Sequence, residues 1–301
     1  MNTFHSRMKE ASTAAAGAPD TGLFSLARLR HRCANPSCHR GKLWSRWLTP
    51  TEPLAFGGTS YCCAGCAETA FEQEIGKHLL RARFEGERPH RIPLGLLLVS
   101  RGMVTGGQLQ QALRTQREQP RRRLGHLLVE QGAISEQSLL TALGNQWGCP
   151  VFPLEKNRDY LECAGLLPLA LLQSTGVLPV HRGRGGRILH LAFTKRVDHT
   201  LLYAIEGMLG CQAAACVASE QAVADAVQRL HSLLPPQETV FDSVRQPQEM
   251  ARMAADYAAK LQAGQVRATR AADYLWFRFE NARGWHHLLF QLQAHDRHSD
   301  L

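Results

Sequence analysis

A duplicated segment between Leu94 and Gln146 constrains the fold of this chain more than any other feature of its sequence. The same pattern of leucines, alanines, glycines and glutamine occurs twice, with each residue of the first copy matched 30 positions later in the second. So many matches in two short windows indicate an internal repeat. The matched positions are Leu94-Gly95 with Leu124-Gly125, Leu98 with Leu128, Gly102 with Gly132, Val104 with Ile134, Leu109 with Leu139, Ala112-Leu113 with Ala142-Leu143, and Gln116 with Gln146.

Each copy of the repeat predicts two short helices joined by a turn. Leu94 and Leu98 are one helical turn apart, so they share a helix face. Gly102 ends this first helix, because glycine readily takes the left-handed conformation found after helix ends. Thr105 and Gln108 form a capping-box pattern that begins the second helix. Two copies therefore predict a four-helix unit with the repeated leucines between the helices.

The tandem pattern R-L-G-x-x-L-x-x-x-G-x-L-x(4)-L-x-x-A-L-x-x-Q resembles the MshEN domain, the N-terminal domain of type II secretion and type IV pilus assembly ATPases. In that family, tandem copies of the motif bind cyclic di-GMP, and the resemblance implies the same capacity here. The second copy matches the motif from Arg123 to Gln146. The first copy has Pro93 where the arginine belongs, and proline cannot donate a hydrogen bond, so this contact is lost unless Arg91 or Arg122 replaces it.

The residues of the motif suit the chemistry of cyclic di-GMP, which carries two phosphates and two guanines. Arginine binds phosphate oxygens or guanine O6 and N7 through its planar guanidinium. Glutamine offers a donor and an acceptor to a purine edge, and leucines form an apolar bed for purine faces. The same leucines and glycines also serve as core and turn residues in a protein without ligand. The predicted contacts are Arg91, Arg123, His126, Gln116 and Gln146, with Gly95, Gly125 and the apolar bed of Leu94, Leu98, Leu109, Leu113, Leu124, Leu128, Leu139 and Leu143.

Composition limits the class of protein and of partner. A chain of 301 residues is long enough for two or three domains with cores of their own, and its 44% hydrophobic content is ordinary for a globular protein. The formal net charge of +9 favours anionic partners such as nucleotides, nucleic acid or acidic lipids. The sequence has no apolar run long enough to span a bilayer and no signal-peptide pattern, which predicts a cytoplasmic protein.

Five of the nine cysteines cluster before the repeat, in the patterns C-x4-C and C-C-x-x-C, and a helix-like run follows the second. This arrangement resembles a treble-clef or zinc-ribbon module, in which four thiolates bind zinc tetrahedrally. The alternative is a small core with unligated thiols. Nearby arginines and two tryptophans also allow a nucleic-acid-binding role. Six side chains, five thiols and one imidazole, are candidates for the four coordination positions. They are Cys33, Cys38, Cys62, Cys63, Cys66 and His39.

The predicted fold is α+β, in four segments. Residues 1–25 are rich in Ala, Ser, Thr and Gly and predict a disordered lead-in. Residues 26–84 form the cysteine-rich module, and residues 90–232 form the MshEN-like domain, with a small α/β subdomain after the helical repeat. Residues 240–296 predict a helix followed by strands, which resembles the segment before the motor of secretion ATPases.

The motor itself is missing from the sequence. A phosphate-binding loop needs the run G-x(4)-G-K-[ST], and the nearest glycine cluster, at residues 183–186, lacks the lysine and hydroxyl at that spacing. We therefore expect a non-enzymatic cyclic di-GMP-binding regulator or adaptor linked to secretion or pilus machinery. Two alternatives stay open: a ligand-free module that docks on a secretion or pilus ATPase, and a zinc-dependent nucleic-acid-binding protein.

Overall fold

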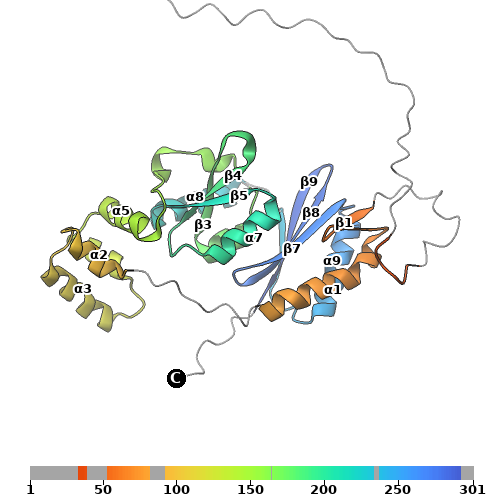
Figure 1. The fold of residues 1–301 in the computed structure, drawn as a ribbon, viewed down its shortest axis with the longest axis horizontal. Coiled ribbons are helices and arrows are strands. Elements are labelled where there is room, and N and C mark those ends of the chain that lie inside the picture. Colours follow the sequence, from red (N-terminus) through yellow and green to blue (C-terminus); the bar gives the residue numbers. More distant parts are fainter. Residues whose placement is uncertain (1–32, 39–52, 82–91, 164, 234–236, 293–301) are drawn as a thin grey trace, which may run out of the picture. The chain divides into compact units, whose positions relative to one another are not determined.

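The computed structural model describes residues 33–38, 53–81, 92–163, 165–233 and 237–292 (Figure 1). The described chain is α+β, as the sequence predicts, and its buried side chains form three hydrophobic clusters. The predicted lead-in at residues 1–25 lies outside the described residues, as do Arg91 and His39.

Four helices form the region that holds the duplicated pattern. Thr105 and Gln108 form the capping box, and Ser135 caps the equivalent helix of the second copy. Gly102 and Gly132 have φ values of 67° and 68°, a conformation that other residues rarely adopt. The four helices are α2 (Leu94–Ser100), α3 (Gly106–Glu118), α4 (Leu124–Glu130) and α5 (Glu136–Trp147).

The two copies are intertwined rather than stacked. The first helix of each copy packs mainly against the second helix of the other, α2 against α5 and α4 against α3. Two equivalent hydrogen bonds cross between the copies. The side-chain Nε2 of Gln116 donates to the backbone carbonyl of Arg122 at 2.9 Å, and Nε2 of Gln146 donates to the backbone carbonyl of Ile92 at 2.7 Å. Leu98 is fully buried between the helices, and so is its counterpart in the second copy.

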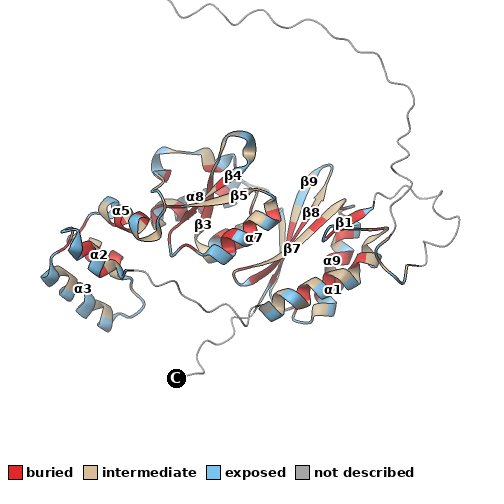
Figure 2. Ribbon diagram, in the orientation of Figure 1, coloured by how far each residue is buried: buried red, intermediate tan, exposed pale blue. Residues whose placement is uncertain are grey.

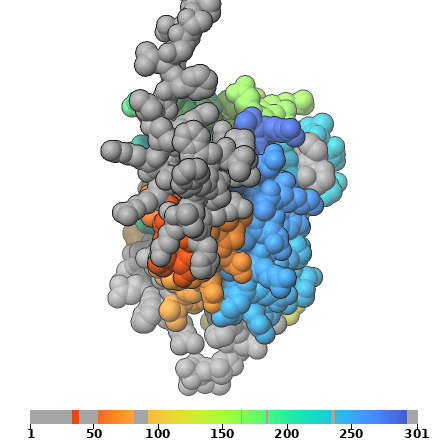
Figure 3. All heavy atoms as spheres, turned by 90° about the vertical axis from the view of Figure 1, so that its right-hand side faces the viewer, coloured from red at the N-terminus to blue at the C-terminus, as the bar shows by residue number. Residues whose placement is uncertain are grey.

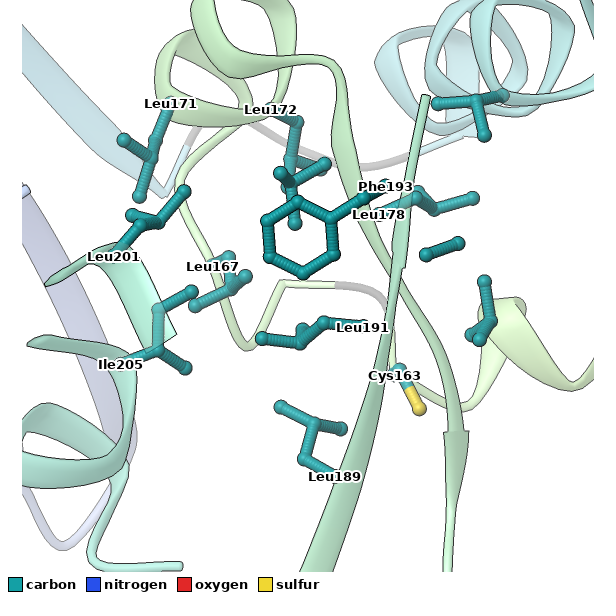
Figure 4. Close-up of a cluster of buried hydrophobic side chains, with 14 of the residues drawn as sticks. Cys163, Leu167, Leu171, Leu172, Leu178, Leu189, Leu191, Phe193, Leu201 and Ile205 are labelled. Atoms are coloured by element: carbon teal, nitrogen blue, oxygen red, sulfur yellow. The ribbon is translucent and has the colours of Figure 1, made fainter. Parts of the chain in front are cut away.

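A three-stranded sheet follows, in the order β3-β4-β5. Strands β3 and β4 are antiparallel, joined by the glycine-rich turn, whereas β5 runs parallel to β4 and therefore needs the crossover helix α7. Asp198 caps α7 by accepting from the amides of Thr200 and Leu201. Phe193 lies at the centre of the cluster beneath this sheet (Figure 4). The elements are α6 (Leu169–Thr175), β3 (Val177–Arg182), β4 (Ile188–Phe193), α7 (His199–Leu209), β5 (Gln212–Val217) and α8 (Glu220–Leu233).

A six-stranded sheet, ordered β2-β1-β7-β8-β9-β6, joins the cysteine-rich segment to the C-terminal strands. Strand β1 pairs in parallel with β7, and helices α1 and α9 pack against each other, so residues 53–81 and 238–292 lie side by side (Figure 3). No local sequence pattern indicates this pairing. The elements are β1 (Leu54–Phe56), β2 (Thr59–Tyr61), α1 (Ala64–Arg81), β6 (Glu238–Phe241), α9 (Pro247–Lys260), β7 (Gln265–Ala271), β8 (Tyr274–Asn281) and β9 (Gly284–Gln291).

Strand β8 is covered on both faces (Figure 2). Phe277 faces the cluster shared with α1 and α9, and Trp276 faces the cluster of the three-stranded sheet. Polar contacts join the same two regions: Arg267 donates to the carbonyl of Met208 at 2.7 Å. The indole of Trp285 donates to the carbonyl of Gly165 at 2.7 Å. The six-stranded sheet therefore shares a hydrophobic core with the three-stranded sheet region that precedes it in the chain.

Candidate functional site

A pocket of about 580 Å³ opens between the second copy of the repeat and the three-stranded sheet region. This volume is within the range of sites that bind organic ligands of a few hundred daltons. Leu139, Leu143 and Trp147 of α5 form an apolar wall, and the N-terminal end of α4 also contributes to the lining. The remaining lining residues are Leu94, Arg123, Gly125, His126, Val129, Glu130, Glu136, Leu140, Thr194, Lys195, Arg196, Ala218, Glu220 and Gln221.

Two basic side chains of the second copy converge on one carboxylate at the pocket. Arg123 Nη1 lies 3.2 Å from Glu220 Oε2, and His126 Nε2 lies at the same distance from that oxygen. The same Arg123 nitrogen donates to the carbonyl of Thr194 at 3.4 Å. All three charged or titratable side chains are about half exposed, so water and ions reach this cluster.

Two further cations, Lys195 and Arg196, enter the pocket lining from the loop after β4. Both are exposed, and neither forms an ion pair with another residue in the described part of the chain. The other carboxylates of the lining are already engaged, since Glu136 accepts from Ser219 at 2.7 Å and Glu130 pairs with Arg122. The pocket is therefore a mixed site with two cations free to meet an anionic ligand.

The pocket contains some of the residues that the motif predicts and not others. The predicted residues that line it are Leu94, Arg123, Gly125, His126, Leu139 and Leu143. Leu98 and Leu128 are completely buried in the core of the four helices, and their expected place in a ligand-facing apolar bed stays a prediction. The others, Gly95, Leu109, Leu113, Gln116, Leu124 and Gln146, lie outside the lining, and Arg91 lies outside the described residues.

The glutamines of the motif have a structural role in the helical repeat. The side-chain nitrogens of Gln116 and Gln146 each bind the backbone just before the first helix of the other copy. Each bond orients the residue that begins that helix, which in the second copy is Arg123. Contact of either glutamine with a purine edge stays a prediction.

Gly95 and Gly125 allow the repeated leucines to approach the first helix of their own copy. A β-carbon at Gly95 would lie 2.8 Å from Leu109 Cδ1, and one at Gly125 would lie 2.9 Å from Leu139 Cδ1. Both distances are shorter than any ordinary carbon contact. The glycines therefore act through packing, and Gly125 also forms part of the pocket surface.

The motif does not identify the part of the pocket that comes from the sheet region. Lys195, Arg196 and Glu220 lie far from the repeat in sequence; Glu220 is 97 positions from Arg123. The one available signal is a basic pair directly after an apolar strand, because side chains after a strand often lie at the edge of a sheet. A second pocket of about 530 Å³ shares Lys195 and Glu220 with the first.

The first copy differs from the second at the positions that line this pocket. The face that corresponds to the second-copy lining carries Pro93 in place of Arg123 and Leu96 in place of His126. Leu96 is 60% exposed. The only first-copy residue in the lining is Leu94, so the first copy contributes apolar surface and no charge to this site.

Four of the five predicted cysteine ligands come together. The sulfur atoms of Cys33, Cys38, Cys62 and Cys66 all lie within 4.8 Å of one another, whereas Cys63 is not part of this group. The separation of Cys38 and Cys62 sulfurs is 3.6 Å, and that of Cys62 and Cys66 is 3.5 Å. Burial raises the pKa of the Cys66 thiol to about 12, so without a cation this group stays protonated at neutral pH.

The backbone around the cluster is held by hydrogen bonds that do not depend on a metal. The Asn35 amide donates to the carbonyl of Cys66 at 3.2 Å, and the Ala34 amide donates to the carbonyl of Ser60 at 2.9 Å. The loop with the first two cysteines is thereby fastened to β2 and α1. Four soft thiolate donors at this spacing match the preference of a tetrahedral zinc ion.

Comparison with solved structures finds chains that are similar to part of this one. A structure of MshE with cyclic di-GMP is 32% identical to this chain, and the match covers 46% of this chain and 99% of that one, with a TM-score of 0.40. The N-terminal domain of XpsE is 20% identical, and the match covers 45% of this chain and 92% of that one, with a TM-score of 0.34. No family model and no curated protein matches the chain.

Proposed function

About half of this chain is an MshEN-like domain, and on this premise we propose that its pocket binds cyclic di-GMP. The observation that carries the proposal is the position of Arg123, the arginine of the intact motif copy, at the edge of a pocket with an apolar wall. A guanidinium binds phosphate oxygens or a guanine edge. Leucine and tryptophan side chains offer the faces on which a purine base packs.

The proposed site divides the ligand between two kinds of surface. Leu139, Leu143 and Trp147 take a guanine base, and Arg123 with His126 takes a phosphate or the edge of a base. Ligand bound in this way touches both the helical repeat and the loop after β4. Binding would therefore stabilise one arrangement of the two regions, which is the physical basis of a sensor.

We propose that the protein acts through binding, without catalysis, as a regulator or adaptor of secretion or pilus machinery. The similarity to MshE, which was solved with cyclic di-GMP, supports the ligand part of this proposal. A partner ATPase and a cytoplasmic location stay predictions. Among the described residues, no helix combines the length and apolar character that crossing a bilayer requires.

Isothermal titration of the full chain with cyclic di-GMP tests the proposal. We expect saturable binding, and we expect Arg123→Ala to weaken it by about 10- to 100-fold, because a charge-assisted hydrogen bond contributes roughly 1.5–3 kcal/mol. Arg114→Ala is the matched control, since Arg114 is an exposed residue of α3 outside the pocket. Absence of binding by the wild-type chain, or equal affinity of the Arg123→Ala variant, would refute the proposal.

We also propose that Cys33, Cys38, Cys62 and Cys66 hold one structural zinc ion. The mutual approach of the four sulfurs supports it. Bound zinc would supply the positive charge that keeps the thiolates deprotonated, and it would fasten the loop at residues 33–38 to β2 and α1. Elemental analysis of the purified chain tests this, and about one zinc per chain is expected. A purified chain that contains no metal, or one that is equally stable before and after metal removal, would contradict the proposal.

The nucleic-acid-binding alternative depends on basic residues and tryptophans between residues 28 and 47, all of which lie outside the described residues. It stays a prediction. A gel-shift assay with and without a chelator distinguishes it from the sensor role, because the cyclic di-GMP pocket does not depend on the cysteine cluster.

A further inference from the structure

We infer that Glu220 is an internal competitor for the anionic ligand, and that Lys195 and Arg196 replace the charge that the first motif copy lacks. The inference rests on the proposed function, because it specifies how the same pocket takes an anion. It assigns binding roles to three residues outside the repeated motif. All three come from the region of the three-stranded sheet, and all three line the pocket.

Glu220 occupies the place that a ligand phosphate would need. One of its carboxylate oxygens lies 3.2 Å from both Arg123 Nη1 and His126 Nε2. A phosphate oxygen makes the same contacts with these donors and carries a comparable charge. Both cannot occupy one position, so binding at Arg123 requires the carboxylate to move away. The half-exposed position of Glu220 allows that movement without exposing a hydrophobic core.

Lys195 and Arg196 supply charge where the repeat does not. The first copy places only Leu94 in the lining, because Pro93 stands at the position of the motif arginine. The two cations follow β4 directly, and the next residue, Val197, is 4% exposed and anchors the loop in the core. Since no described carboxylate pairs with either cation, an incoming anion meets them without displacing a partner.

The two groups of cations therefore suit a ligand with two negative charges. One phosphate would bind at Lys195 and Arg196 first, because those side chains are unpaired. The second would bind at Arg123 only after Glu220 has left. The free-energy cost of displacing Glu220 from Arg123 is small, since exposed ion pairs contribute little in water. Glu220 therefore lowers the affinity of the pocket for the ligand but does not prevent binding.

Titrations of the full chain with cyclic di-GMP test each part of the inference. Glu220→Gln keeps the size of the side chain and removes its charge, so we expect about two- to fivefold tighter binding, the range that corresponds to an exposed ion pair. Glu249→Gln is the matched control, because Glu249 is an exposed glutamate in the first turn of α9. Lys195→Ala/Arg196→Ala should weaken binding about tenfold or more, and circular dichroism melts would verify that each variant folds.

The outcomes separate this inference from the proposed function. Tighter binding by Glu220→Gln with weaker binding by the double variant supports both. Unchanged or weaker binding by Glu220→Gln, when the wild-type chain binds, overturns the competitor role and leaves the proposed function standing. Binding by Glu220→Gln alone would mean that the carboxylate blocks the pocket, which contradicts both a sensor role for the wild-type chain and the modest competition inferred here. If neither chain binds, both proposals fall.

Discussion

The buried imidazole of His287 should make the stability of this protein depend strongly on pH. His287 is 1% exposed, and its Nδ1 accepts from the indole of Trp276 at 3.1 Å. Its Nε2 lies 3.2 Å from the carbonyl of Gly165, to which it must donate. A neutral ring satisfies both contacts, whereas a protonated ring would direct two donors at each other on the Trp276 side. Burial accordingly lowers the pKa of His287 to about 3.

The sign and size of the effect follow from this pKa. An exposed histidine in the unfolded chain has a pKa of about 6.5, so between pH 6.5 and 3 the unfolded chain binds a proton that the folded chain excludes. The contribution of His287 to stability is complete above pH 6.5 and is lost as pH falls through this window. The loss is about 1.4 kcal/mol per pH unit, or roughly 2 to 3 kcal/mol between pH 6.5 and 4.5.

Urea unfolding of the wild-type chain and of His287→Gln at several pH values from 7.5 to 4.5 measures the effect. Glutamine keeps one donor and one acceptor but does not titrate, so the difference between the two slopes isolates His287. Glu238, whose pKa burial raises, contributes with the opposite sign and cancels because both chains contain it. Equal pH dependence of the two chains would refute the assignment of a neutral, buried ring.

Two further predictions concern packing and metal. Gly144→Ala should destabilise the chain by about 1–3 kcal/mol in thermal unfolding, because the new β-carbon would lie 2.8 Å from a backbone carbonyl oxygen. Gly106→Ala is the control, because a β-carbon there would meet no neighbouring atom within 4 Å. Cys62→Ser should abolish stoichiometric zinc in elemental analysis, whereas Cys63→Ser should retain it, since only Cys62 belongs to the sulfur cluster. Equal metal content in the two cysteine variants would contradict that cluster as the binding site.

The repeat pattern predicts those features that depend on neighbouring residues along the chain. The capping box of Thr105 and the left-handed glycines after α2 and α4 form as local chemistry requires. Each involves a hydrogen bond or a backbone angle within about four residues. Such contacts need no information about the rest of the fold.

The pocket is only partly predictable, because many of its contacts join residues that are far apart in the sequence. Arg123 is identified because it belongs to the motif, and His126 because it directly follows the motif glycine Gly125. Periodicity cannot distinguish a leucine that faces a ligand from one that faces a core. Leu98 and Leu128 have the spacing of the apolar bed and are fully buried between the helices. Lys195, from a loop outside the motif, is brought to the site by packing alone.

The sequence by itself determined the helices of the repeat, their caps, the α+β class and the five cysteines that are candidates for metal binding. The tertiary structure alone decided that β1 pairs with β7, about two hundred residues away, and that Glu220 meets Arg123. Local features follow from the stereochemistry of adjacent residues. Distant pairings arise from hydrophobic burial, which is non-directional, and from backbone hydrogen bonds, which are alike for nearly every residue type. The packing of the whole chain therefore selects among many pairings that the sequence pattern allows equally.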